Sequence, residues 1–360
     1  MTPSPTSFSA DYAAARARFL DAAHAANASL ASHDHPLTGP AGEALMTDVA
    51  WLGPPDAERV LVTVSATHGV EGFAGSAAQI DWLERGEDRR LRDCAALLVH
   101  AINPYGFAWQ RRVTHENVDL NRNWIDFDAG LPQRAAYDAL HAALCPADWS
   151  TAAQGRTFGE LQASLQTMGL PAFAAVVSGG QHAHADGLFY GGAGPTHARI
   201  TLESILRQRL QSARRVGIID FHTGLGPPGH GELIVSAAAR SGFARRAREW
   251  FGAAITTTGA EDSASAKLSG EWQPAAEALL PDAQVTAVAL EFGTVDVFQV
   301  LNALRADNWL HTHGGGDVDR HPDVKRGIRA AFDVDSADWR GRVLGQALAV
   351  SRSALAGLQA

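Results

Sequence analysis

Short, nearly continuous apolar runs alternate along the chain with segments whose apolar residues recur at helical spacing. Four runs rich in β-branched and aliphatic residues predict strands that helices cover on both faces: residues 59–65, 95–102, 215–221 and 285–290. The helical spacing predicts helices at residues 9–31, 75–85, 133–144, 195–212, 242–251 and 337–358. This alternation of strands and helices indicates an α/β fold.

The chain shows no internal repeat and no low-complexity linker, so we expect a single domain over residues 1–360. Residues 145–194 are less regular and rich in glycine, and we interpret them as an irregular excursion from the main sheet. The helix expected at residues 337–358 could cover the sheet or a second copy of the chain. A homo-oligomer therefore stays open at this point.

Composition narrows the class of protein. A hydrophobic fraction of 46% and a charged fraction of 19% are typical of a packed globular core. The net charge of −9 argues against nucleic acid as a partner, and the absence of a run of 18 apolar residues argues against a membrane span. Cys94 and Cys145 are too few for a disulfide framework, and the first residues lack the pattern of a signal peptide, so we expect a cytoplasmic protein.

Polar residues with metal-binding chemistry follow two of the predicted strands. His68 and Glu71 lie in a glycine-flanked turn after residues 59–65, and His222 follows residues 215–221. Ligands of open α/β sheets bind outside the carboxyl ends of the strands, where these side chains should meet. A histidine and a glutamate three positions apart are expected by chance in a chain with this many histidines. The joint placement of these residues and Glu291 after three apolar strands is what indicates a metal site.

A further carboxylate, Glu291, stands at the end of residues 285–290. Two histidines and one carboxylate, with a fourth position left for water, form the ligand set of a catalytic zinc. Glu291 would then be free to act as a base. The same ligand set also accepts nickel, cobalt or iron.

Arginine and asparagine are concentrated between residues 103 and 124, in the sequences NPYGF, RR and VDLNRN. Guanidinium groups bind carboxylates with two parallel hydrogen bonds, so the segment suggests recognition of an anion. The alternative is a loop that internal salt bridges hold in place.

Six motifs in this order resemble the M14 zinc carboxypeptidase superfamily: HGVE, NPYGF, RR, VDLNRN, DFHTG and LEFGT, over residues 60–294. Within the superfamily the chain looks most similar to the bacterial DUF2817 branch. The last two motifs also resemble the branch of aspartoacylase and succinylglutamate desuccinylase. The resemblance implies a three-layer α/β sandwich with a mixed, mostly parallel eight-stranded sheet between helices, and one bound Zn²⁺ per chain.

The resemblance also implies roles for particular residues. It makes His68, Glu71 and His222 the zinc ligands, Asp119 the partner that orients His68, Glu291 the general base, Asn121 and Arg122 the clamp for a terminal carboxylate, and Arg112 the group that polarises the scissile carbonyl. Arg111 is the competing candidate for that last role. Digestive members of the superfamily carry a mobile tyrosine between the last histidine and the glutamate, and residues 223–290 contain no tyrosine. Tyr190 could swing into the site instead, or it could be buried under a glycine turn.

Two other pairs of histidines stand out. His182 and His184 could extend the metal site to a second ion, but solvated loop histidines are the favoured interpretation. His311 and His313 suggest no chemical role.

The sequence therefore predicts a zinc-dependent hydrolase of an amide bond next to a free carboxylate. Its substrate would be a small carboxylate-bearing peptide or an N-acyl amino acid. One alternative is a non-catalytic protein that binds a carboxylate ligand and keeps a vestigial metal site. Another is a hydrolase of a modified sugar or lipid, which no motif supports.

Overall fold

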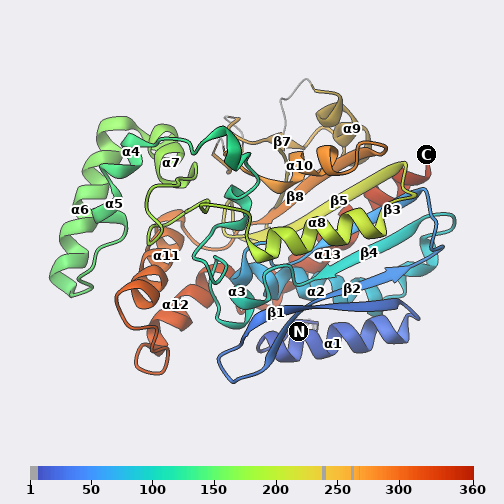
Figure 1. Cartoon of the computed structure of the whole chain (residues 1–360), viewed down its shortest axis with the longest axis horizontal. Helices are drawn as coiled ribbons and strands as arrows, with labels where there is room; N and C mark the ends of the chain where they lie inside the picture. Colours follow the sequence, from blue (N-terminus) through green and yellow to red (C-terminus); the bar gives the residue numbers. More distant parts are fainter. Residues whose placement is uncertain (1–6, 237–240, 261–262, 267) are drawn as a thin grey trace.

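The computed structural model describes residues 7–236, 241–260, 263–266 and 268–360. Within these residues, eight strands form one sheet in the order β1-β2-β4-β3-β5-β8-β6-β7 (Figure 1). The strands are β1 (Ser29–Thr38), β2 (Ala44–Leu52), β3 (Arg59–Val64), β4 (Ala95–His100), β5 (Arg215–Thr223), β6 (Gly231–Val235), β7 (Thr256–Thr257) and β8 (Gln284–Phe292).

The sheet is mixed. Its central strands β4, β3, β5 and β8 run parallel, whereas β1–β2, β2–β4 and β6–β8 are antiparallel pairs and β6–β7 is a parallel pair. The predicted α/β fold with a mixed eight-stranded sheet is therefore confirmed. Because β3, β5 and β8 are parallel neighbours, their carboxyl ends meet at one edge of the sheet.

Helices cover both faces of the sheet, as two residues of β5 on opposite faces show. A side chain at Gly217 would meet Trp250 of α9 (Gly242–Phe251) and Leu358 of α13 (Ala337–Gln359), so these helices lie on one face. Asp220 points to the opposite face and accepts a hydrogen bond from Trp272 of α10 (Trp272–Leu279). The first face also carries α2 (Gly72–Glu84), against which α1 (Tyr12–Ala25) packs, and α8 (His197–Arg209) lies beside α10.

A group of helices extends beyond one end of the sheet (Figure 1). It contains α4 (Ala135–Asp138), α5 (His141–Leu144), α6 (Thr151–Met168), α7 (Leu170–Ser178), α11 (Val297–Thr312) and α12 (Pro322–Phe332), and the short α3 (Pro104–Ala108) lies between it and the sheet. A cluster of buried apolar side chains joins these helices, including Leu144, Leu161, Phe173, Leu304 and Phe332. The helices around the end of the sheet therefore have an apolar core of their own.

The structure departs from the sequence prediction in three segments. The helix expected at residues 9–31 ends at Ala25, and β1 begins at Ser29 after a left-handed residue, Asn27. The side chains of β1 are mostly exposed and polar, so this edge strand gives no apolar signal. Residues 133–144 form two short helices, α4 and α5, instead of one. The supposedly irregular residues 145–194 contain the 18-residue helix α6, whose apolar face is narrow because only Ala153, Thr157 and Leu161 are buried.

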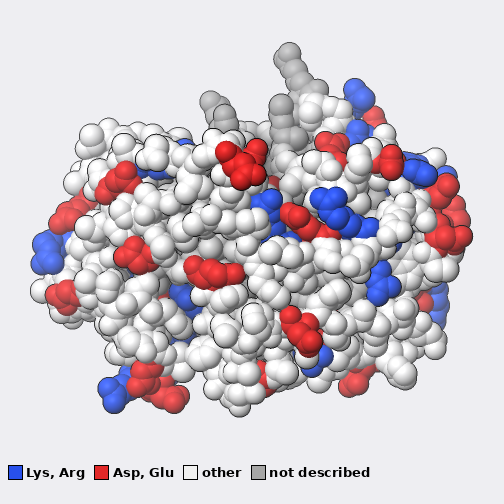
Figure 2. Space-filling model, viewed as in Figure 1, with Lys and Arg blue, Asp and Glu red and all other residues white. Residues whose placement is uncertain are grey.

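Acidic and basic side chains are interspersed on the face of the molecule in Figure 2, with uncharged surface between them. In the part of the chain that the structure describes, no helix combines the length and the apolar character that a bilayer crossing needs.

Asp307 of α11 connects the outer helices to the loop that carries Arg111. Its carboxylate accepts hydrogen bonds from Arg111 Nε at 3.1 Å and from Lys325 Nζ of α12 at 2.5 Å. Burial alone would raise the pKa of Asp307, but Lys325 and Arg111 hold it below its ordinary value. The carboxylate is therefore the shared counter-ion of two cations.

We expect Asp307→Asn to lower the free energy of unfolding by about 3 kcal/mol, because it leaves two largely buried cations without their partner. Urea unfolding followed by circular dichroism measures this. Asp323→Asn, on the exposed side of α12, is the matched control and should change stability by less than about 0.5 kcal/mol. Equal stability of the two variants would contradict this role of Asp307.

Candidate active site

The turn after β3 sets the positions of His68 and Glu71. Ala66 adopts a φ of 59°, a left-handed conformation that is strained for a residue with a side chain. Gly69 lies so close to Gly106 that a Cβ atom on Gly69 would be 2.0 Å from the carbonyl carbon of Gly106. Only glycine fits at position 69, and this close contact holds the turn against the following loop.

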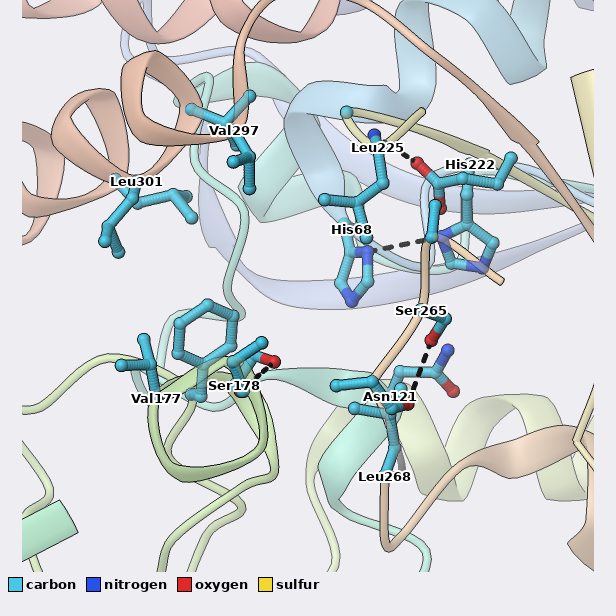
Figure 3. A pocket seen from close by; sticks show the side chains of 18 of the residues that line it. His68, Asn121, Val177, Ser178, His222, Leu225, Ser265, Leu268, Val297 and Leu301 are labelled. Carbon is cyan, nitrogen blue, oxygen red and sulfur yellow. Dashed lines mark hydrogen bonds between the residues drawn. The ribbon is translucent and has the colours of Figure 1, made fainter. Parts of the chain in front are cut away.

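The side chains of His68, Glu71 and His222 converge at the carboxyl ends of β3 and β5. The Nδ1 atoms of the two histidines are 3.2 Å apart, and they lie 2.9 and 3.0 Å from the two carboxylate oxygens of Glu71. All three residues are buried. Figure 3 shows the two rings side by side, joined by the dashed line. The three residues can offer one ligand atom each to a single metal ion.

The outward-facing nitrogen of each ring pairs with a buried carboxylate. His68 Nε2 lies 3.0 Å from Asp119 Oδ1, and His222 Nε2 lies 2.7 Å from Asp220 Oδ2. Asp220 also accepts hydrogen bonds from Thr67 Oγ1 at 2.7 Å and Trp272 Nε1 at 2.6 Å. Metal-binding histidines commonly donate their second N–H to a carboxylate, which orients the ring and fixes its tautomer. The donor set and its surroundings therefore fit a metal centre.

The positive groups around Glu71 keep it ionised. Burial alone would raise the pKa of Glu71, but His68, His222 and Arg112 lower it. Burial likewise opposes charge on His222, but Asp220 and Glu71 raise the pKa of its imidazole well above the ordinary value. The carboxylates therefore make the centre attractive to positive charge.

Glu291 lies beside this cluster. It is the register partner of His222 across β5 and β8, and its Oε1 accepts a hydrogen bond from the amide of Leu225 at 3.0 Å. Burial, and then the negative charge of Glu71, raise the pKa of Glu291. A carboxyl group with a raised pKa in a cavity is suited to proton transfer.

The two neighbouring arginines point in different directions. Arg112 Nη1 donates to Glu71 at 2.9 Å, and Arg112 Nε donates to Asp119 at 3.0 Å. Arg111 instead binds Asp307 and, through Nη2, the side chain of Asn117 at 3.0 Å. Arg112 is therefore the arginine of this pair that reaches the histidine–carboxylate cluster.

Arg122 and Asn121 line the cavity next to the cluster. Arg122 donates to the carbonyl of Ser178 from Nε at 2.9 Å and from Nη2 at 2.7 Å, and to the carbonyl of Asn121 from Nη1 at 2.9 Å. These bonds use three of the five N–H groups of a guanidinium, and Nη1 also forms an ion pair with Asp119 Oδ1 at 3.7 Å. The side chain of Asn121 accepts a hydrogen bond from the amide of Trp272 at 3.2 Å.

The rest of the cavity wall is mainly apolar. Val177, Val297 and Leu301 face His68 across it (Figure 3). Leu170 and Val297 keep 55% and 44% of their surface exposed although they are large and apolar. Phe189 also lines the cavity, and its ring lies 5.5 and 5.7 Å from the guanidinium carbons of Arg112 and Arg122. An apolar wall thus lies opposite the histidines.

Tyr190 does not line this cavity; its neighbour Phe189 does. Tyr190 is 8% exposed, and its backbone carbonyl accepts a hydrogen bond from the amide of Asp119. Its role in substrate binding stays a prediction.

Several other residues of the polar motifs support the fold. Asn103 caps the first turn of α3, where Pro104 follows at a position that suits proline. Asn117 and Asn123 donate hydrogen bonds to backbone carbonyls of residues 185–194. His182 binds the carbonyl of Gly192, outside the His68–His222 cluster.

Contacts between distant parts of the chain place three further residues at the site, to which the sequence analysis assigned no role: Asp220, Phe189 and Trp272. Of these three residues, only Asp220 could have been found from the sequence. It stands two positions before His222 on a strand, where both side chains must point to the same face.

The chain belongs to the DUF2817 family, described as a protein family of unknown function, whose model matches residues 8–346. The placement in this family that the motifs suggested is therefore confirmed. No curated protein matches the sequence.

Solved structures with a similar course of the chain include three enzymes or candidate enzymes. A candidate metallopeptidase from Shewanella amazonensis is 14% identical, with 89% of this chain and 92% of that chain covered and a TM-score of 0.44. Carboxypeptidase A from Helicoverpa armigera is 11% identical, with 90% and 74% covered and a TM-score of 0.47. Succinylglutamate desuccinylase from Chromobacterium violaceum is 14% identical, with 88% and 73% covered and a TM-score of 0.37. At these values nothing about activity follows.

If the cluster binds a divalent ion such as Zn²⁺, we expect Asp220→Asn to weaken that binding by about 10–100-fold, because the amide cannot hold His222 as the carboxylate does. Competition with a chromophoric chelator measures the affinity. Asp282→Asn, at an exposed position, is the matched control and should bind Zn²⁺ as the parent does. An unchanged affinity in Asp220→Asn would show that Asp220 serves only the fold.

Proposed function

We propose that this protein is a zinc-dependent hydrolase of an amide bond next to a free carboxylate, in the manner of a metallocarboxypeptidase or an N-acyl amino-acid deacylase. The observation that supports it most is the convergence of His68 Nδ1, His222 Nδ1 and the Glu71 carboxylate, with Glu291 beside them and Arg122 in the same cavity. Cys94 and Cys145 are buried free thiols, which supports a reducing compartment such as the cytoplasm.

His68, Glu71 and His222 would hold the ion, with Asp119 and Asp220 orienting the two rings. Zinc, or another divalent ion that accepts this donor set, supplies Lewis acidity that polarises a carbonyl group and makes water more acidic. The chain's own part is to keep the two imidazoles in one tautomer and orientation before substrate arrives.

Glu291 is the proposed general base. The amide of Leu225 fixes Oε1, so Oε2 is the oxygen that can take the proton from an attacking water. The raised pKa of Glu291 favours the protonated form after that transfer, so the group can pass the proton on to the leaving nitrogen.

Arg112 and Arg122 would bind different groups of the substrate. Arg112 would stabilise the negative charge that develops on the carbonyl oxygen. To do so it would turn part of its hydrogen bonding away from Glu71. Arg122, with Asn121 beside it, would bind the free carboxylate through the N–H groups that its contacts with Ser178, Asn121 and Asp119 leave unused.

The alternative of a binding protein with a vestigial metal site has a specific observation against it. Glu291 would be a costly residue in such a site, because a buried carboxyl without a full set of partners destabilises the fold. A role in proton transfer would explain a carboxyl group at position 291, whereas ligand binding alone would not.

We expect Glu291→Gln to keep the metal and the fold but to lower kcat by about 10²–10⁴-fold, because the amide has nearly the same shape and cannot accept a proton. Hydrolysis of N-acyl amino acids and dipeptides, with elemental analysis of both proteins, measures this. Glu249→Gln, at an exposed position on α9, should leave the rate unchanged. A Glu291→Gln protein that turns over at the parent's rate would remove Glu291 from the mechanism.

We expect the parent to prefer substrates with a free α-carboxylate over their amides, and Arg122→Ala to reduce that preference by about 10–100-fold, the value of a charge-assisted pair of hydrogen bonds. The assay compares kcat/KM for the acid and the amide of the same compound. The amide serves as an internal control, because a general loss of fold affects both forms. Equal kcat/KM for acid and amide in the parent would rule out the carboxylate clamp.

A further inference from the structure

A second group of histidines and carboxylates lies in the helical part of the chain beyond the sheet. His141 at the start of α5, and His184 and Asp186 from the loop of residues 181–187, can each offer one ligand atom, and these atoms lie within 4.8 Å of one another. Asp138, the last residue of α4, stands beside them, with Oδ1 2.9 Å from His184 Nε2. The group thus contains two imidazoles and two carboxylates.

The two rings are stacked. Their centroids are 3.9 Å apart and their planes differ by 16°. His141 Nε2 is 3.5 Å from Asp186 Oδ1, so each ring has its own carboxylate. A neutral imidazole can donate its Nε2–H to its own carboxylate, so the two pairs use only one nitrogen of each ring. A shared divalent ion lies in the plane of each imidazole that binds it, so one ring would turn out of the stack to reach the ion, whose charge would offset both carboxylates.

Hydrogen bonds from side-chain amides fix the backbone of the loop that carries His184 and Asp186. Gln181 is fully buried, and its side chain accepts hydrogen bonds from the amides of Ala183 and His184 and donates one to the carbonyl of His184. Asn308 donates to the carbonyl of Asp186 at 2.8 Å. The backbone is therefore fixed by side-chain amides, and the side chains of His184 and Asp186 are left to face His141.

The other half of the group is tied to the same loop. Tyr137, next to Asp138 in α4, donates a hydrogen bond from its hydroxyl group to the carbonyl of Leu188 at 2.8 Å. The Nδ1 atom of His141 is buried and has no hydrogen-bond partner among the described residues. Pairing with Asp186 thus leaves this imidazole only half satisfied. The backbone around the group is thus fixed in advance, and the ring of His141 keeps one nitrogen that a ligand can use.

We propose that His141, His184 and Asp186 form a second site for a divalent transition-metal ion, separate from His68, Glu71 and His222. Asp138 would supply the fourth ligand. Imidazole and carboxylate together suit Zn²⁺, Co²⁺, Ni²⁺ or Cu²⁺ better than Ca²⁺ or Mg²⁺, which prefer oxygen ligands alone. His141 and His184 expose 17% and 28% of their side chains, so an ion can enter from solvent.

The proposed site would strengthen the connection between α4–α5 and a loop that leads into the cavity. Two residues after Gly187 comes Phe189, whose ring lies over both Arg112 and Arg122. An ion at His141 and His184 would therefore stabilise the segment that forms this part of the cavity wall.

The test counts ions on the full-length protein after chelator treatment and reloading with Zn²⁺. We expect two ions per chain in the parent, and one in each of the variants His184→Ala and His222→Ala. His24→Ala, an exposed histidine on α1, is the control and should keep two. The visible absorption of bound Co²⁺ should show two components in the parent and one in each site variant.

Other results separate this proposal from the proposed function. A parent with one ion that is lost in His222→Ala and kept in His184→Ala would overturn the second site and leave the first intact. One ion lost in His184→Ala and kept in His222→Ala would support the second site and refute the first.

Asp186→Asn covers the case in which His184→Ala fails to fold, because the Asp186 side chain is 52% exposed. We expect it to weaken binding at the second site by about tenfold or more, since loss of an outer partner alone costs about 10–100-fold. Unchanged affinity at that site would overturn the assignment of Asp186 and, with it, the proposed ligand set.

Discussion

The structure depends most on how it neutralises buried negative charge at the carboxyl ends of β3 and β5. Glu71, Asp119 and Asp220 expose 1%, 0% and 0% of their surface. A buried carboxylate destabilises a protein strongly unless positive groups and hydrogen-bond donors surround it. Here His68, His222 and the neighbouring donors fill that role. The histidines are thereby held with Nδ1 inward and Nε2 outward, which is also the orientation that a metal ion needs.

The arrangement extends from this centre to the outer helices through Arg111 and Arg112. Arg112 binds Glu71 and Asp119, whereas Arg111 binds Asp307 of α11. Backbone hydrogen bonds from Gly69 and Val70 to the carbonyls of these two arginines join the same loop to the turn of His68. Hydrogen bonds therefore link α11 to the candidate metal centre, although the helix supplies only apolar side chains to the cavity.

The sequence was sufficient where a local pattern determines the position of a residue. An apolar run defines β3, β5 and β8, and a polar residue at the end of a parallel strand lies at a known edge of the sheet. The proximity of His68, Glu71, His222 and Glu291 could be predicted in this way. Strand β1 could not, because an exposed edge strand lacks an apolar face.

The sequence could not predict the side-chain positions that depend on contacts between residues far apart in the chain. Arg111 and Arg112 are adjacent in a loop, and only the buried Asp307, far away in the chain, decides which of them faces the cluster. The ring of Phe189 reaches the two cavity arginines because residues 181–187 are held by Gln181 and Asn308. No spacing rule connects such residues.

The cavity combines two requirements that a single small substrate would have to meet. At one end, Arg122 is bound to Ser178 at the end of α7 and is the proposed contact for a substrate carboxylate. Along the same helix, Leu170, Phe173 and Val177 line the cavity with apolar surface. A carboxylate at Arg122 would therefore place the adjoining part of its own molecule against α7. Burial of an apolar group there would offset part of the cost of removing that carboxylate from water. The proposed substrate class thus narrows to carboxylates that carry an apolar group, whether as a side chain or as an acyl chain.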